Sequence, residues 1–474
     1  MLLLAFAVTA CSDDTFSTDS SKSLDFAADT IKFDTIFSTV PSQTQSLWVY
    51  NRSGANLKCS TVRLERGNQT GFRVNVDGTY LGQTTGYATT DIEIRDNDSI
   101  RIFAEATLPT NYKDGPTRVE DNLVFTLESG KQQKICLSAF SWDAQVMHNV
   151  VVSNDSTIAY QGKPIVIYGG ITVDEGATLT IDKGATLYFH SGSGIDVYGR
   201  LVCNGEPDNE VTLRGDRLDN MFSYLTYNEV SGQWKGIHLY EKSYGNTISY
   251  TDIHGTFSGI VADSSDINQK KLDIESSTVH NCQGYGIKAD CSNISIKNCQ
   301  ITNTLNDCLF VNGGKAEVNN TTMAQFYPFD SNRGYALHFA PTPYPLSSLV
   351  CNNSIITGYA NDVLLGESSK DSLVENNFTF SHCLIRTPKI ETDDSLKFVS
   401  VIFEDVKDTI VSGKKNFRLV DGKKQKYDFR LDSVSLAIGL ADKATAMPLD
   451  RKATRRDDQP DAGAYEYVAP DEKQ

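Results

Sequence analysis

Residues 272–293 read LDIESSTVHNCQGYGIKADCSN, and residues 294–315 read ISIKNCQITNTLNDCLFVNGGK, with apolar residues at the same places. Val279, Ile301 and Met323 follow one another at intervals of 22 residues. This period, with three short strands in each repeat, predicts a solenoid whose coils stack in parallel. One coil cannot bury its inward side chains alone. Coils stacked at ~4.8 Å form continuous apolar ladders and satisfy one another's backbone groups.

The repeat continues on both sides of this stretch, and we expect it to span residues 145–440 as roughly a dozen coils. A β-propeller is the alternative architecture, although each of its blades needs about twice this period. Asparagine tolerates the left-handed backbone conformation that tight corners need. The side chains expected to point inward are Ile274, Val279, Ile296 and Ile301. The expected corner residues are Asn281, Asn298, Asn303, Asn319 and Asn320.

The repeat resembles the right-handed parallel β-helix repeat family, and segments outside the counted stretch resemble parts of its members too. These segments are residues 234–237 followed by 246–253, and, near the C-terminus, residues 428–431 and 461–466. The resemblance covers about two thirds of the chain and implies a right-handed parallel β-helix with a closing segment and tail over 441–474. It implies little about activity, because this fold carries lyases, hydrolases, adhesins and proteins without known activity.

Residues 24–142 show a different pattern, in which short runs of alternating apolar and polar residues stand between turn signals. Examples are residues 31–37, 72–76 and 123–127. Several short strands at this spacing predict an antiparallel β-sandwich, broadly immunoglobulin-like. We therefore expect an all-β chain in which an Ig-like β-sandwich, acting as a spacer, precedes the parallel β-helix.

The first 23 residues carry the features of an export signal and a tether. Residues 1–10 contain no charge and read as the apolar part of a signal peptide. Residues 8–11 (VTAC) resemble a bacterial lipobox, and the acidic residues behind them resemble the export signal of surface lipoproteins in the Bacteroidota. Residues 12–23, rich in Ser, Thr and Asp, are typical of a flexible tether. The resemblance implies that a lipid on Cys11 holds the protein at the outer membrane, exposed at the cell surface.

Charge and composition argue against nucleic acid as a partner and against a membrane-spanning segment. The formal net charge is −16 and no basic stripe is present, which argues against nucleic acid. The basic cluster at 451–456 is followed by two aspartates, and we expect a solvated tail there. No apolar run approaches the ~20 residues of a membrane span, so the predicted membrane contact is the lipid anchor alone. For Cys59 and Cys136 the sequence leaves open one disulfide or two free thiols.

The catalytic motifs of known β-helix enzymes are missing. Polygalacturonases of this fold carry Asn-Thr-Asp, Asp-Asp and Gly-His-Gly segments on adjacent coils; the first and third are absent, and the Asp-Asp pairs lie outside the regular coils. The Trp-Ile-Asp-His segment of pectate lyases, the calcium nonapeptide of RTX proteins and the HExxH zinc helix are absent too. The sequence therefore assigns no metal ligands and no cofactor, and calcium is expected only if the protein is a lyase.

Two histidines stand out within the repeat. Alignment of the coils puts His254 and His280 in one outward column about 5 Å apart, with Asp252 in the outward column on the other side of the inward residues. Such a pair suits proton transfer, a shared metal or hydrogen bonds to sugar hydroxyls, although two surface histidines on a polar sheet is the simpler interpretation. Lys288 and His338 occupy matching outward positions on the next strand, where a lyase would need its base. Arg333 or Lys297 would then hold the uronate.

Two aromatic-rich insertions interrupt the coils, at residues 216–231 and 327–345. Loops on a rigid solenoid often carry binding surfaces, and Tyr224 and Tyr344 could stack on sugar rings. Covering the end of an apolar ladder is the other role open to such aromatics.

We therefore predict a surface-anchored lipoprotein whose β-helix binds, or presents toward, an extracellular polysaccharide or another cell-envelope component. The ligand-binding candidates are His254, His280, Tyr224 and Tyr344. The alternative is a polysaccharide lyase or glycoside hydrolase acting on an acidic glycan, with His254, His280 and Lys288 as catalytic candidates.

Overall fold

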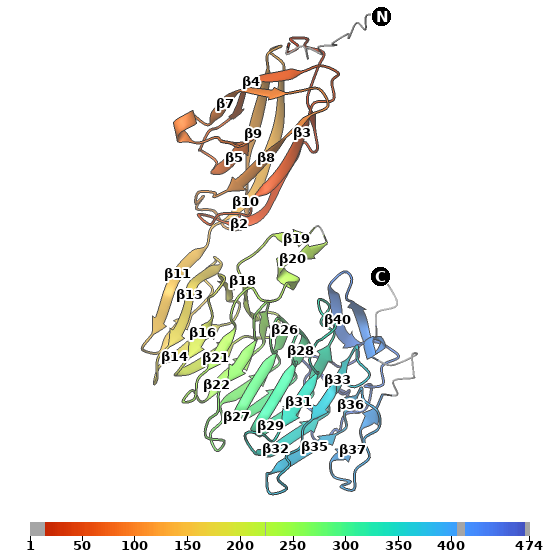
Figure 1. The fold of residues 1–474 in the computed structure, drawn as a ribbon. Coiled ribbons are helices and arrows are strands. Elements are labelled where there is room, and N and C mark those ends of the chain that lie inside the picture. The colour runs from red at the N-terminus through yellow and green to blue at the C-terminus, as the bar shows by residue number, and fades with distance from the viewer. Residues whose placement is uncertain (1–14, 223, 405–412, 470–474) are drawn as a thin grey trace, which may run out of the picture. The chain divides into compact units, whose positions relative to one another are not determined.

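The computed structural model describes residues 15–222, 224–404 and 413–469 (Figure 1). The chain divides into two compact units, one ending at Ala144 and one beginning at Gln145. This boundary agrees with the predicted change from sandwich to repeat. Cys11 lies outside the described residues, so the lipid anchor stays a prediction.

The first unit is a β-sandwich of two five-stranded sheets that enclose one apolar core. Its first sheet has the order β1-β3-β8-β5-β6, and its second has the order β2-β10-β9-β4-β7. The strands are β1 (Asp25–Phe26), β2 (Thr30–Phe37), β3 (Gln45–Tyr50), β4 (Leu57–Leu64), β5 (Phe72–Val76), β6 (Thr79–Tyr80), β7 (Ala88–Ile94), β8 (Ser99–Ala106), β9 (Thr117–Leu127) and β10 (Gln132–Trp142), with a 3-10 turn η1 (Gln83–Thr85). Alternation drives this fold, as in β5, where Phe72, Val74 and Val76 are buried and the residues between them are not. The predicted β-sandwich is confirmed.

Two details of the first unit refine the sequence analysis. Cys59 and Cys136 are both free thiols, the first buried and the second partly exposed. The described part of the expected tether, residues 15–23, follows the sandwich surface: the Ser17 backbone N–H donates to the Asn56 carbonyl (2.9 Å), and the Lys22 ammonium donates to the Ser53 carbonyl (2.6 Å). The flexible-tether prediction is therefore wrong for this part, because backbone and lysine hydrogen bonds hold it on the domain.

The second unit is a parallel β-helix built from a 26-stranded sheet, β11 to β18 and β21 to β38, that winds around itself in three ladders (Figure 1). Ladder 1 starts with the first halves of β11 (Gln145–Val152) and β13 (Ile165–Val173) and continues through β15 (Thr186–Phe189), β18 (Val211–Gly215), β23 (Thr251–His254), β26 (Thr278–Cys282), β28 (Gln300–Thr304), β30 (Thr322–Gln325), β33 (Ile355–Gly358), β36 (Leu384–Ile385) and β38 (Ile402–Phe403).

Ladder 2 continues from the second halves of β11 and β13 through β16 (Ile195–Val197), β21 (Ile237–Leu239), β24 (Ile260–Ala262), the first parts of β27 (Ile287–Lys297) and β29 (Leu309–Asn319), β31 (Leu337–Ala340) and β34 (Leu364–Gly366). Ladder 3 consists of β12 (Ser156–Ile158), β14 (Thr178–Asp182), β17 (Arg200–Asn204), β22 (Asn246–Ser249), β25 (Leu272–Glu275), the last parts of β27 and β29, β32 (Leu346–Asn352), β35 (Asn376–Ser381) and β37 (Phe398–Val399).

The register of the coils follows the period counted in the sequence. Ile274 pairs with Ile296, and Val279 pairs with Ile301; all of these side chains are fully buried in the β-helix core, as predicted. Four of the expected corner residues adopt a positive φ, namely Asn281, Asn298, Asn303 and Asn320. Asn319 instead ends strand β29. Within the described residues no helix is both long and apolar enough to cross a membrane.

The coils end at Phe403, not at residue 440 as expected. After the 3-10 turn η3 (Gly413–Asn416), β39 (Phe417–Asp421) and β40 (Lys426–Leu431) form an antiparallel hairpin. Phe417, Phe429 and Leu431 of this hairpin pack on ladder 1 of the late coils. Ladder 1 exposes apolar outward residues there, such as Ile355, and the hairpin buries them instead of adding a further coil.

The C-terminal segment, residues 441–469, also packs along ladder 1, and the solvated-tail prediction for 451–456 is wrong. The Arg451 guanidinium makes two hydrogen bonds to the Glu210 carboxylate (3.0 and 2.7 Å), and Arg456 pairs with Glu466 (3.1 Å). Both arginine side chains are only 2% exposed. Corner asparagines hold the segment as well, since the Asn298 amide donates to the Leu449 carbonyl (2.7 Å).

Candidate functional site

His254 and His280 lie side by side on the outward face of ladder 1. Strands β23 and β26 pair in parallel, with His254 opposite His280 and Asp252 opposite Thr278. The two imidazole rings stack with their centroids 4.8 Å apart. The predicted column and spacing are confirmed, because one coil separates the two residues.

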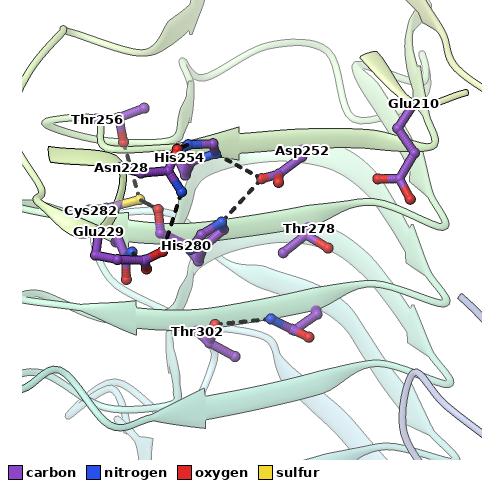
Figure 2. A network of polar contacts seen from close by, with 12 residues as sticks. Glu210, Asn228, Glu229, Asp252, His254, Thr256, Thr278, His280, Cys282 and Thr302 are labelled. Carbon is purple, nitrogen blue, oxygen red and sulfur yellow. Dashed lines mark hydrogen bonds and ion pairs between the residues drawn. The ribbon is translucent and has the colours of Figure 1, made fainter. Parts of the chain in front are cut away.

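Asp252 joins the two histidines into one cluster. Strand alternation sends Asp252 and His254 to the same side of β23, with the buried Ile253 between them. Asp252 Oδ1 lies 3.0 Å from His254 Nδ1 and 3.1 Å from His280 Nε2, so both rings converge on one carboxylate oxygen (Figure 2). We call Asp252, His254 and His280 the histidine cluster.

The insertion between β18 and β21 covers this cluster. It contains a short hairpin of β19 (Asn220–Phe222) and β20 (Leu225–Thr226), followed by the 3-10 turn η2 (Tyr227–Glu229). Asn228 Oδ1 lies 3.1 Å from His254 Nε2, and Glu229 accepts a hydrogen bond from the Asn281 amide (3.0 Å; Figure 2). His254 is only 4% exposed as a result. The interpretation as two surface histidines therefore fails for His254.

Burial and mutual charge set the protonation of the histidine cluster. Burial alone would raise the pKa of Asp252, but the charges and hydrogen bonds of His254 and His280 outweigh it and hold that pKa well below its usual range. Burial lowers the pKa of His254. Burial would lower the pKa of His280 too, but Asp252 and then Glu229 outweigh it and raise that pKa. Asp252 is therefore an ionised ligand or hydrogen-bond acceptor at neutral pH.

A cleft of about 560 Å³ lies beside the cluster, between ladder 1 and the β39–β40 hairpin. We call it the hairpin cleft. Its floor comes from the coils and from η2, and its wall comes from the hairpin and the C-terminal segment. The lining residues are Glu229, His280, Gln300, Thr302, Asn303, Leu419, Gln425, Lys426, Tyr427, Asp428, Phe429, Arg430, Lys452 and Tyr465. Of the two histidines, His280 lines the cleft and His254 lies beneath the insertion.

The polar groups of the hairpin cleft hold one another in place. The Tyr465 hydroxyl donates to Gln300 Oε1 (2.8 Å), and the Gln300 amide donates to the Thr302 hydroxyl (3.3 Å). Arg430 and Asp428 form an ion pair (2.6 Å) on the hairpin. The cleft thus offers fixed donors and acceptors and charges of both signs beside two tyrosines, which is a surface that suits a polyhydroxylated ligand.

The residues predicted as a lyase base lie elsewhere. Lys288 is on ladder 2, and its ammonium binds Asp290 (2.7 Å) rather than a member of the histidine cluster. His338 also lies on ladder 2, between Asp307 and Glu367 (3.0 Å each). Arg333 stacks over the Tyr359 ring, and Lys297 approaches Glu317 at 3.8 Å. The structure does not bring these groups together with His254 and His280.

The two predicted aromatic platforms are also separate from the cleft. Tyr224 is 65% exposed in the β19–β20 hairpin, where its ring stacks with Phe222. Tyr344 lies against Gly313, at the corner between ladders 2 and 3. The tyrosines that line the hairpin cleft are Tyr427 and Tyr465, which the sequence analysis did not single out.

The sequence did not predict several of the side chains around the site, and the reason can be identified. Asn228 and Glu229 belong to an insertion, and the repeat gives such a segment no register. Lys426 to Arg430 were assigned to a coil, although the resemblance of residues 428–431 to a closing segment was the signal that this part ends the β-helix. Asp252 was placed correctly in its column but received no role.

The family comparison supports the fold. Residues 145–379 match the family model for the right-handed β-helix region. The coils form a right-handed parallel β-helix. No curated protein matches the chain.

Solved structures with some likeness to the chain include the following three, all at low sequence identity. The pectate lyase Pel9A is 12% identical over 69% of this chain and 88% of its own, with a TM-score of 0.28. The Agl-KA catalytic domain is 12% identical over 73% of this chain and 76% of its own, with a TM-score of 0.24. A family 123 glycoside hydrolase from Clostridium perfringens is 10% identical over 25% of each chain, with a TM-score of 0.17, so this chain spans a quarter of that structure.

Proposed function

We propose that the protein binds an extracellular polysaccharide, or another glycan of the cell envelope, in the hairpin cleft. The observation that carries this proposal is the make-up of that cleft, which His280, Gln300 and Thr302 from adjacent coils line together with Tyr427 and Tyr465. Sugars are bound by several hydrogen bonds together with contact on an aromatic face. Each stacking contact adds only about 0.5–1.5 kcal/mol beyond burial, so affinity should grow with polymer length.

Charge in the cleft favours a ligand that carries anionic groups without being a dense polyanion. Lys426, Arg430 and Lys452 line it together with Glu229 and Asp428. Two of the cations already have carboxylate partners, since Arg430 binds Asp428 (2.6 Å) and Lys452 binds Glu210 (2.8 Å). Lys426 is exposed at the rim and is the cation best placed to meet a uronate.

Retention on a panel of immobilised acidic and neutral polysaccharides tests the proposal. The parent protein should be retained on at least one of them, and Lys426→Ala together with Gln300→Ala should reduce retention several-fold. Lys183→Ala is the matched control, because Lys183 is an exposed lysine of the early coils that pairs with Glu206. Failure of the parent to bind any polysaccharide, or equal loss in the control, would contradict the proposal.

The alternative is a polysaccharide lyase or glycoside hydrolase acting on an acidic glycan, and one observation favours it. The cleft is lined by two carboxylates, Glu229 from the floor and Asp428 from the hairpin wall. Burial would raise the pKa of Asp428, but its bonds to Arg430 outweigh burial and lower it, so this carboxylate stays ionised. New reducing or unsaturated ends during incubation with the retained polysaccharide would establish this alternative, and calcium would be tested as its activator.

We further propose that the protein is anchored in the outer membrane through Cys11 and exposed at the cell surface. The lipobox order and the acidic residues behind it support this. A Cys11→Ser variant should leave the membrane fraction and become inaccessible to surface proteolysis. Retention of the variant in the membrane at the parent's level would contradict the anchor.

A further inference from the structure

The histidine cluster differs from the same positions on the following coils. Thr278 and Gln300 follow Asp252 in its column, while Thr302 and Ala324 follow the two histidines. Stacking of the coils thus needs no charged group at these positions. On the preceding coil Arg214 stands next to His254 in this column, so the charged residues gather at the coils from which the insertion between β18 and β21 leaves, which points to a local role.

We propose that Asp252, His254 and His280 form a binding site for a divalent transition-metal ion, with Zn²⁺ as the ion that the ligand set fits. Each residue offers one ligand atom, and these atoms lie within 4.8 Å of one another. Two imidazoles and one carboxylate suit zinc and its neighbours in the transition series rather than Ca²⁺ or Mg²⁺, which prefer oxygen ligands alone. This inference does not depend on glycan binding.

The hydrogen bond to Asn228 orients His254 for such a role. Asn228 donates its amide N–H to Glu229 Oε1 (3.2 Å), which turns its carbonyl oxygen toward His254 Nε2 (3.1 Å). With Nε2 donating to Asn228, Nδ1 is the ring nitrogen that faces Asp252 Oδ1, at 3.0 Å, and it is the atom placed to bind an ion. Donation from the far nitrogen to an oxygen acceptor is also what orients metal-binding histidines.

A third potential ligand atom lies beside these two. His280 Nε2 approaches the same Asp252 oxygen at 3.1 Å, so three potential ligands converge. One carboxylate oxygen can accept an N–H from each ring, and a metal ion bound by all three atoms would replace both of these protons. Zinc at ~2.1 Å from each ligand in tetrahedral geometry would place the ligand atoms ~3.4 Å apart, a few tenths of an ångström more than the observed distances. Rotation of the partly exposed Asp252 carboxylate can supply that change.

The site has a path to solvent and a free fourth position. His280 lines the hairpin cleft, and the Asp252 side chain is 32% exposed, so an ion can enter from the cleft. Three protein ligands leave a fourth position for water, as in zinc sites that are not purely structural. His254, beneath the insertion, would be the buried anchor of the site.

The test uses the purified full chain with any affinity tag removed and Zn²⁺ or Co²⁺ alone as the probe. Metal stoichiometry and affinity are measured by competition with a chromogenic chelator, and Co²⁺ coordination is read from visible absorption. The variants are Asp252→Asn, His280→Gln and Asn228→Ala. His338→Gln is the matched control, since His338 is another half-buried histidine between two carboxylates. Thermal unfolding verifies that each variant is folded.

We expect one Zn²⁺ per chain, and a tetrahedral Co²⁺ spectrum in the parent and in His338→Gln. Asp252→Asn and His280→Gln should each weaken binding by more than about 100-fold, and Asn228→Ala by about 10- to 100-fold, the usual effect of losing an outer partner. No binding by the parent would show that the cluster shares protons only and would overturn the proposal. Equal binding in folded Asp252→Asn and His280→Gln would overturn it too, because the metal would then sit elsewhere.

Discussion

Glu210→Gln should destabilise the β-helix substantially, because it removes the charge that compensates a buried arginine. Arg451 is 2% exposed and makes two hydrogen bonds to Glu210 and a third to the Thr278 hydroxyl (3.2 Å). Removing one partner of a buried ion pair costs about 3–5 kcal/mol. Glu210 is 19% exposed and Arg451 keeps its bond to Thr278, so we expect the lower end, about 3 kcal/mol.

Urea denaturation, monitored by the fluorescence of Trp234, measures this loss of stability. Trp234 is buried in the β-helix core, stacked on Phe189 with ring centroids 4.2 Å apart. Trp48 and Trp142 of the sandwich are replaced by Phe in all samples, so that the signal reports the β-helix alone. Glu206→Gln is the control, because Glu206 forms an exposed pair with Lys183 and its loss should cost at most about 1 kcal/mol. Equal effects of the two substitutions would refute the role assigned to burial.

The same pair predicts a pH dependence. Burial would raise the pKa of Glu210, but Arg451 and then Lys452 outweigh it and hold the pKa below its ordinary value of 4.5. A carboxyl whose folded pKa is depressed stabilises the fold above its unfolded pKa and loses that contribution as the pH falls through the folded pKa. The difference in unfolding free energy between the parent and Glu210→Gln should therefore be largest near pH 7 and shrink below about pH 4.5. A difference that grows on acidification would contradict this sign.

Two further predictions concern the core. Ile296→Asp should bury an unpaired charge at a fully buried position and cost several kcal/mol of stability. Ile296→Val should cost only about 0.5–1.5 kcal/mol. Urea titration of both variants checks the predicted register, and an Ile296→Asp protein as stable as the parent would contradict it. Burial raises the thiol pKa of Cys203, Cys282, Cys299 and Cys308 to about 12, so among the described cysteines only Cys136 and Cys291 should react quickly with Ellman's reagent at pH 8 before unfolding. Rapid modification of more than two of the described thiols in the folded protein would show that the core opens.

The repeat made most of the β-helix predictable. The apolar ladders require one inward residue of each strand at a fixed interval, so the spacing of Val279 and Ile301 determined both the register and the neighbours of each residue. His254 and His280 could be paired for this reason, and Asp252 could be placed in its column. The β-sandwich was predictable from strand alternation, which has the same cause, a sheet with one buried face.

Segments that do not repeat were not predictable in this way. Asn228 reaches His254 because of how an insertion folds back, and its position depends on tertiary contacts that have no period. The basic residues at 451–456 look solvated in sequence, since the partner of Arg451 lies 241 residues away. The β39–β40 hairpin has the same alternation of apolar and polar residues as the coils. Only the apolar outward face of the late coils favours packing of the hairpin on ladder 1 over formation of a further coil.

The C-terminal segment changes how this solenoid should unfold. Stacked repeats generally behave as a one-dimensional array that can fray from either end, because each coil touches only its neighbours. Here residues near the C-terminus bind Glu210, Asn298, Asn320 and Asn353, which belong to coils spread over much of the β-helix. Partial opening of any of these coils must break a bond to the same segment. Unfolding of the β-helix should therefore be more cooperative than nearest-neighbour stacking allows. Opening of a late coil weakens the hold of the C-terminal segment on the early coils as well.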